Sequence, residues 1–174
     1  MNLTLNDSKR QDHFNELDKK YMKLALKLAK KAEIKGEVPI GAVLVAGDGS
    51  ILSTAINSRE ELHTVLGHAE LMALHRACKK RKSWRLTDCT LYVTLEPCFM
   101  CAGALYQARV KRVIYATPDP KGGALKSLAS LADDSRLNHR YIAQDGLFAE
   151  ESSLMLKNFF KQKRNKKKSL NPSS

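Results

Sequence analysis

The chain has 174 residues, enough for one domain with a full hydrophobic core and short tails at both ends. Its hydrophobic fraction of 43% is ordinary for a soluble protein, and apolar runs such as 42–46 are too short to cross a bilayer. Thirty lysines and arginines against eighteen acidic residues give a formal net charge of +12, which favours a polyanionic partner or an anionic membrane surface.

Residues 1–17 show no convincing periodicity, and we expect them to form a flexible leader. They contain neither the apolar core nor the small-residue cleavage site of a secretory signal, so we expect a cytoplasmic protein with no membrane association. Because that compartment is reducing, metal binding is a more plausible use of the four cysteines than disulfide formation. They are Cys78, Cys89, Cys98 and Cys101.

The first regular element is predicted to be a helix that begins at Asp18. Apolar residues from Tyr21 to Ala32 recur at helical spacing, and Gly36 follows as a stop signal. The β-branched segment 38–46 and the segment 51–56 then flank a Gly-Asp-Gly-Ser turn, which predicts a β-hairpin.

The rest of the chain alternates between helices and strands. We predict a helix that begins near His68 and ends in a basic cluster, then elements at 90–95 (strand), 98–108 (helix), 112–116 (strand), 141–144 (strand) and 147 to about 163 (helix). This order predicts an α/β fold in which one mixed sheet carries helices on both faces. We assign residues 18–165 to this domain and residues 166–174 to a disordered basic tail.

The basic residues are concentrated in two segments. Residues 157–174 contain seven of the thirty lysines and arginines and no acid, and residues 76–85 contain six around the only tryptophan, Trp84. Each segment by itself is more typical of a solvated surface than of a binding site.

Two short motifs indicate chemistry. His68-Ala69-Glu70 opens one predicted helix, and Pro97-Cys98-Phe99-Met100-Cys101 opens another. Cys98 and Cys101 are three residues apart, so both thiolates project from one face of a first helical turn, where the helix dipole favours their ionised form. With His68 they form a ligand set suited to tetrahedral zinc with its fourth position open.

An open position on zinc implies a coordinated water, whose pKa falls to roughly 7. Attack on a ring carbon also needs one proton delivered to the ring nitrogen and another to the departing amine, and Glu70 is the candidate for both. Taken singly, a Cys-x-x-Cys pair could instead be a redox couple or half of a structural zinc site. The combination of His-x-Glu with Pro-Cys-x-x-Cys is the signature of zinc-dependent nucleobase deaminases.

From about Asp18 to Arg164 the chain resembles the bacterial tRNA-specific adenosine deaminases. Beyond the zinc motifs, the resemblance rests on the segments 37–43, 91–98, 100–104, 138–140 and 159–160. It implies a three-layer α/β/α cytidine-deaminase-like fold with a five-stranded mixed sheet. It also implies a homodimer, one Zn²⁺ per subunit with no organic cofactor, and a target adenosine flipped out of the tRNA anticodon stem-loop at the wobble position.

The resemblance further implies a set of substrate contacts. Asn57 matches a residue that hydrogen-bonds the purine, Asp119 one near the nucleotide before the target, and Phe160 one in the helix that touches the anticodon stem-loop. The pocket wall is expected at Ile40, Ala69 and Leu95. The segment 64–67 (Thr-Val-Leu-Gly) departs from the family's usual Asp-Pro-Thr-Ala, which predicts a more apolar and flexible approach to His68.

Two other functions fit parts of this pattern. A zinc deaminase of a free base or nucleoside, such as guanine or cytosine, would use the same ligands, but it has no use for a strongly basic face. A non-catalytic RNA-binding module would use zinc only to hold two helices together, and it would not need Glu70.

Overall fold

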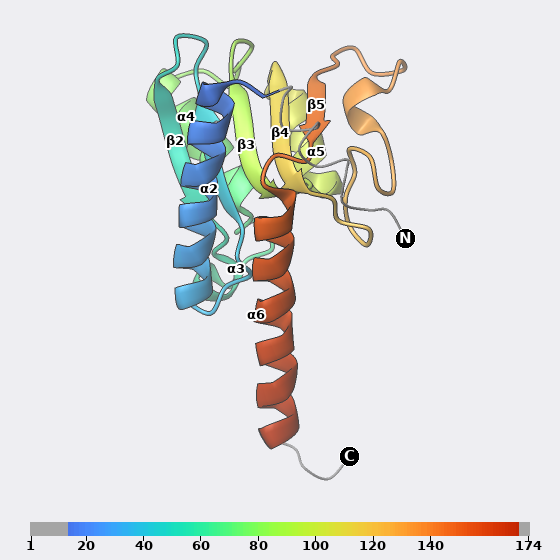
Figure 1. Cartoon of the computed structure of the whole chain (residues 1–174). Helices are drawn as coiled ribbons and strands as arrows, with labels where there is room; N and C mark the ends of the chain where they lie inside the picture. Colours follow the sequence, from blue (N-terminus) through green and yellow to red (C-terminus); the bar gives the residue numbers. More distant parts are fainter. Residues whose placement is uncertain (1–13, 171–174) are drawn as a thin grey trace.

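The computed structural model describes residues 14–170 and forms a five-stranded sheet with helices on both faces (Figure 1). The strands are β1 (Gly41–Val45), β2 (Ile51–Ile56), β3 (Thr90–Leu95), β4 (Arg112–Thr117) and β5 (Ile142–Asp145). The helices are α2 (Glu16–Ile34), α3 (Arg59–Leu62), α4 (Ala69–Arg81), α5 (Phe99–Gln107), the 3₁₀ turn η1 (Leu131–Asp133) and α6 (Ala149–Leu170). None of the helices within 14–170 has the length and apolar character needed to span a bilayer.

The strand order is β2-β1-β3-β4-β5, and the sheet is mixed as expected. β1 pairs antiparallel with both β2 and β3, whereas β3, β4 and β5 run parallel. Parallel strands require a crossover connection, which α5 supplies between β3 and β4 and the segment containing η1 supplies between β4 and β5. The carboxyl ends of β3 and β4 therefore lie at the same edge, where α4 and α5 begin.

Alternation along the strands assigns a core to each face of the sheet. In β1, Ala42 and Leu44 pack into the cluster that includes α4 and α5 residues, whereas Val43 and Val45 pack into the cluster that includes α2 residues. All four side chains are at most 4% exposed. The three-layer α/β/α prediction is confirmed.

The first strand begins later than predicted, at Gly41 rather than at residue 38. Pro39 has no N–H to contribute to a sheet, and Ile40 N–H is used in a local bond to Val38 O. Gly41 lies so close to α2 that a Cβ would stand 2.2 Å from Ala25 O. Glycine at this position lets the helix pack directly on the sheet.

The domain also begins earlier than the predicted leader boundary at residue 17, because α2 starts at Glu16. The Asn15 side chain accepts the Asp18 N–H at 2.8 Å, while Asp18 Oδ2 accepts the Asn15 N–H at 3.2 Å. This reciprocal cap satisfies two N–H groups at the helix start. Phe14 is buried in the α2 core, so residues 14–17 belong to the fold. The leader residues 1–13 lie outside the described residues.

The last helix, α6, extends to Leu170, so residues 166–170 are helical rather than part of the disordered tail that we expected. No Gly or Pro interrupts residues 149–170, and lysines favour helix. Near its start, Ser152 Oγ donates a hydrogen bond to Thr94 O and ties α6 to the sheet. Figure 1 shows the far half of α6 running past the sheet edge where α4 and α5 begin.

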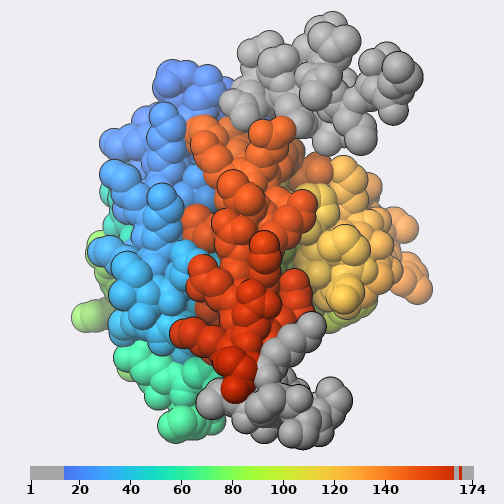
Figure 2. Space-filling model, turned by 60° about the horizontal axis from the view of Figure 1, so that its bottom comes forward, coloured from blue at the N-terminus to red at the C-terminus, as the bar shows by residue number. Residues whose placement is uncertain are grey.

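α2 and α6 lie side by side on one face (Figure 2). The groove between them is lined by Leu26 and Lys27 of α2 and by Leu154 and Met155 of α6. It lies on the opposite face of the sheet from α4 and α5, so it is separate from the two helix starts that carry the sequence motifs.

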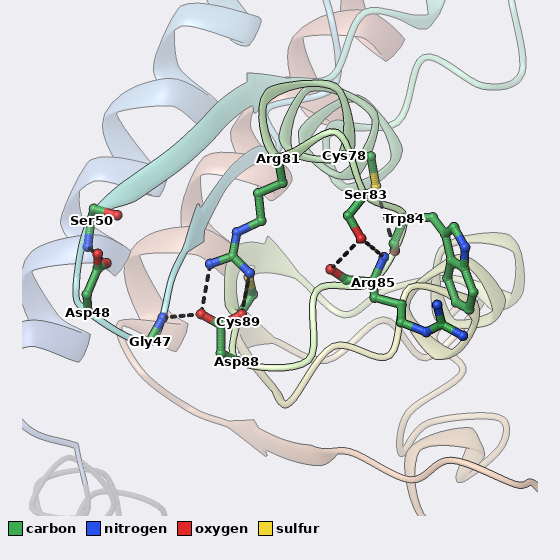
Figure 3. A network of polar contacts seen from close by, with 10 residues as sticks. All are labelled: Gly47, Asp48, Ser50, Cys78, Arg81, Ser83, Trp84, Arg85, Asp88 and Cys89. Carbon is green, nitrogen blue, oxygen red and sulfur yellow. Dashed lines mark hydrogen bonds and ion pairs between the residues drawn. The ribbon is translucent and has the colours of Figure 1, made fainter.

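The basic segment 76–85 lies at the far end of α4 (Figure 3), and much of it is used to hold the fold together. Arg81 forms a two-bonded ion pair with Asp88, which also accepts the Gly47 N–H at 2.9 Å. Arg85 stacks on exposed Trp84 at 4.2 Å from the ring centre. Because α4 is 13 residues long, this cluster lies about 20 Å from the start of the helix.

Candidate active site

Three potential metal ligands meet where two helices begin. His68 caps the N-terminus of α4, Cys98 caps α5, and Cys101 lies in the first turn of α5. His68 Nδ1 lies 3.7 Å from Cys98 Sγ and 3.5 Å from Cys101 Sγ. The three ligand atoms all lie within 4.8 Å of one another, so the structure brings the predicted ligands together.

The spacing of these atoms fits zinc. With Zn–N near 2.0–2.1 Å and Zn–S near 2.3 Å, a tetrahedral ion separates a nitrogen and a sulfur ligand by about 3.6 Å. The two observed N–S separations, 3.7 and 3.5 Å, agree with that value. No fourth His, Cys, Asp or Glu within residues 14–170 joins the group, so the protein leaves one position of a tetrahedral ion open.

The two thiols are poised differently. A hydrogen bond from Cys101 lowers the pKa of Cys98 to about 3, whereas the same contact and burial raise the pKa of Cys101. The remaining cysteines lie elsewhere: Cys78 faces Trp84 O at 3.9 Å, and Cys89 is fully buried.

Glu70 lies beside the ligands on the first turn of α4 and is only 3% exposed. Burial raises the pKa of its carboxyl to about 7, and Cys101 is among the groups that contact it. Its Oε2 atom has no hydrogen-bond partner among residues 14–170. A buried, unpaired carboxylate oxygen is costly unless a ligand or water satisfies it, so Glu70 fits a group that meets the substrate.

Asn57 follows β2 and is 3% exposed. Its backbone N–H donates to Ile40 O at 3.0 Å, and its side-chain Nδ2 donates to Glu37 Oε2 at 3.2 Å. Glu37 is itself 1% exposed and accepts the Glu61 N–H through Oε1 at 2.8 Å. Asn57 is a predicted site residue and Glu37 is not, since a lone glutamate after a helix carries no sequence signal.

The loop before His68 is apolar, as expected, with Val65 and Leu66 more than half exposed. Its predicted flexibility stays a prediction, but its last residue is held by backbone contacts. Ser58 N–H donates to Gly67 O at 2.8 Å, and a Cβ on Gly67 would stand 2.7 Å from Ser58 O. The two backbones pack directly together, and this contact brings the segment after Asn57 against the residue before His68.

The other predicted contacts lie in three places. Ala69 is fully buried beside His68, while Ile40 and Leu95 are half-buried at the start of β1 and the end of β3. Asp119 lies in the loop after β4, and its N–H donates to Glu96 Oε2 at 2.9 Å. Phe160 lies on α6, where it is 45% exposed and edge-on to Phe159.

The fold and this cluster together define a nucleobase deaminase: a mixed sheet with one His and two Cys at paired helix starts, and a buried glutamate beside them. The family model of MafB19-like deaminases matches residues 16–164. The chain is 50% identical to the tRNA-specific adenosine deaminase of Bacillus subtilis (strain 168) over 151 residues, 87% of this chain and 93% of that protein. It is 43% identical to the enzyme of the same name from Haemophilus influenzae, over 88% of this chain and 89% of that protein. The chain belongs to the tRNA-specific adenosine deaminase family.

Solved structures agree with this placement. A structure described in a study of A-to-I editing by tRNA:A34 deaminases superposes with a TM-score of 0.75 at 42% identity, covering 79% of this chain and 99% of that chain. The guanine deaminase of Bacillus subtilis superposes with a TM-score of 0.56 at 39% identity, covering 60% of this chain and 66% of that chain. The predicted cytidine-deaminase-like fold is confirmed by the first of these.

Proposed function

We propose that this protein hydrolyses adenosine to inosine at the wobble position of tRNA, using one Zn²⁺ per subunit held by His68, Cys98 and Cys101. The observation that carries this proposal is the three-ligand cluster with Glu70 buried beside it and its Oε2 unpaired. Family membership supports adenosine in tRNA as the substrate.

The ligand set indicates what the site does. When bound, zinc supplies a nucleophile at neutral pH by lowering the pKa of a coordinated water. Glu70 takes a proton from the attacking water and delivers it to the purine ring nitrogen next to the reacting carbon. A second proton transfer through Glu70 lets the exocyclic nitrogen leave as ammonia, and the ring carbon becomes the carbonyl of inosine.

We assign the substrate contacts to the residues whose positions match those of the family. Asn57 hydrogen-bonds the purine, and Ile40, Ala69 and Leu95 form the wall of its pocket. Asp119 meets the nucleotide before the target, and Phe160 meets the anticodon stem-loop. These roles are supported by the packing of the Asn57 segment against Gly67 and by the course of α6 past the site's edge of the sheet.

The charge supports RNA as the partner. On α6, Lys157, Lys161, Lys163 and Arg164 have exposed side chains, and the chain has a formal net charge of +12. Phosphates attract such a surface, whereas a free neutral base gains nothing from it. We further propose that the protein acts as a homodimer in the cytoplasm, as the family resemblance implies.

A second candidate is a guanine deaminase, which the 39% identity to the Bacillus subtilis guanine deaminase structure favours. One experiment separates the two. The zinc-loaded protein is incubated with an anticodon stem-loop that has adenosine at the wobble position, and in parallel with guanine, cytidine and adenosine. We expect inosine only in the stem-loop. Turnover of guanine with no inosine in RNA would contradict the proposal.

A further inference from the structure

A buried carboxylate lies one residue after β3 and directly before the segment that carries Cys98. Glu96 is 2% exposed, and its backbone N–H donates to Thr117 O at 2.9 Å. No cation pairs with it among the described residues; nearby Lys126 directs its Nζ to Asp145 at 2.9 Å instead. The carboxylate is therefore satisfied entirely by neutral donors.

Those donors come from both ends of one loop. Glu96 Oε1 accepts the backbone N–H groups of Leu125, Lys126 and Ser127 at 3.0, 2.8 and 2.9 Å. Its Oε2 accepts the Asp119 N–H at 2.9 Å and the Ser127 hydroxyl. Although burial opposes ionisation, these hydrogen bonds, led by that of Ser127, leave the pKa of Glu96 below its ordinary value.

The same loop touches the metal-ligand segment through its backbone. Gly123 pairs with Cys98 in an isolated β-bridge, and Ala124 N–H donates to Pro97 O at 2.9 Å. A Cβ on Gly123 would stand 2.2 Å from Glu96 Cδ, so only glycine fits between the loop and the carboxylate. The loop 119–127 is thus fixed to Cys98 on one side and to Glu96 on the other.

We propose that Glu96 is a positioning residue for RNA: it fixes the loop 119–127 beside Cys98 and so places Asp119 against the nucleotide that precedes the target base. This inference rests on the proposed function. The two carboxylate oxygens bond different parts of the loop: Oε1 accepts the backbone N–H groups of residues 125–127, whereas Oε2 accepts the Asp119 N–H, whose residue is otherwise held by the Gly123 N–H on its carbonyl at 2.9 Å.

Because the two oxygens bond different groups, one substitution can remove the bond to Asp119 and keep those to residues 125–127. In Glu96→Gln, the amide oxygen can keep the three N–H groups of residues 125–127, and the amide NH₂ can donate to the Ser127 hydroxyl. The Asp119 N–H then faces another donor and loses its partner. The variant is therefore expected to loosen Asp119, whose carbonyl still accepts the Gly123 N–H at 2.9 Å, while leaving the rest of the loop and the zinc ligands in place.

The test combines three measurements on the zinc-loaded full chain. We expect Glu96→Gln to retain one zinc and to keep kcat for stem-loop deamination within about twofold, while KM and the directly titrated Kd for the stem-loop rise about tenfold, the effect of one hydrogen bond. Hydrogen exchange should become faster at the Asp119 amide and remain slow at residues 125–127. Asp145→Asn, which removes only the outer ion pair of the same loop, should leave all three unchanged.

Gly123→Ala provides a second route if Glu96→Gln folds poorly, because it retains the carboxylate and displaces the loop. It should raise KM and Kd in the same direction. An unchanged Kd with a reduced kcat, loss of zinc, or unchanged exchange at Asp119 would each overturn the inference. If the wild-type chain shows no activity on the stem-loop, the proposed function fails, whereas the exchange measurement still tests whether Glu96 fixes the loop.

Discussion

Asn57 and Glu37 form a buried pair in which the orientation of one amide is set by one carboxylate. Asn57 Nδ2 lies 3.2 Å from Glu37 Oε2, and the other carboxylate oxygen accepts the Glu61 N–H at 2.8 Å. Because a carboxylate only accepts, it turns the NH₂ of Asn57 towards itself. The Asn57 Oδ1 atom has no hydrogen-bond partner within residues 14–170, so it is left as an acceptor for the substrate.

Glu37→Gln should disturb recognition without removing Asn57. The glutamine oxygen can still accept the Glu61 N–H, but its NH₂ then faces Asn57 and requires that amide to rotate. We expect kcat/KM for the stem-loop to fall about tenfold, the effect of one lost hydrogen bond. Glu33→Gln, in the last turn of α2, serves as the matched control and should have no effect. Wild-type kcat/KM in Glu37→Gln would show that the amide orientation does not matter.

Glu70→Gln should separate metal binding from proton transfer. The amide fills the same buried space, so zinc content and fold are expected to be retained, while kcat falls on the order of a hundredfold or more. Single-turnover inosine formation is the measurement, with Glu150→Gln on α6 as an exposed control. If kcat is unchanged, Glu70 is not the proton carrier.

RNA binding should depend steeply on salt. Each phosphate contact contributes about −0.7 to −0.9 to the slope of log K against log salt concentration. We expect the double variant Lys161→Gln/Arg164→Gln on α6 to bind the stem-loop more weakly and with a shallower slope. Lys111→Gln, at the opposite edge of the sheet, should match the wild type in a titration from low to high salt. Equal slopes in all three proteins would remove α6 from the interface.

The ion pair at the far end of α4 predicts a pH dependence of stability (Figure 3). The hydrogen bond from Arg81 holds the pKa of Asp88 well below its ordinary 3.8. Its stabilising contribution is therefore complete above about pH 5 and is lost as the pH falls through the lowered pKa. Because Asp88 is 43% exposed, we expect under about 1 kcal/mol.

Thermal melting of wild type and Asp88→Asn from pH 7 to pH 2 measures this contribution. The difference in Tm should stay constant down to about pH 5 and shrink below pH 4. A difference that grows on acidification would contradict the assignment, because it would require the pKa of Asp88 to be raised in the folded state.

Much of the fold could be predicted from sequence because local signals agreed with the tertiary structure. Strand 51–56 and strand 90–95 have their predicted bounds, since turn residues flank each. Other boundaries depended on contacts that no local pattern reports. Gly41 begins β1 because α2 packs against it, and Asp18 is buried because Arg112 and Tyr92 bond it across the sheet.

The residues of the candidate site likewise divide into those that local sequence patterns reveal and those that they do not. His68, Cys98 and Cys101 could be found from spacing, because metal ligation requires particular residue types at helix starts. Glu37 and Glu96 could not, because each acts through a partner that is distant in sequence: Asn57 twenty residues away for Glu37, and Asp119 twenty-three residues away for Glu96. Only the folded arrangement brings these carboxylates to the groups that they position.

The convergence of three ligands on one ion is tested most directly by measuring zinc content and inosine formation together in Cys101→Ser and Cys78→Ser. Cys78 is half-buried at the far end of α4, so Cys78→Ser should carry about one zinc per chain and deaminate like the wild type. Cys101→Ser should lose both the metal and the activity. A Cys101→Ser protein that retains one zinc and forms inosine at the wild-type rate would contradict the proposed active site.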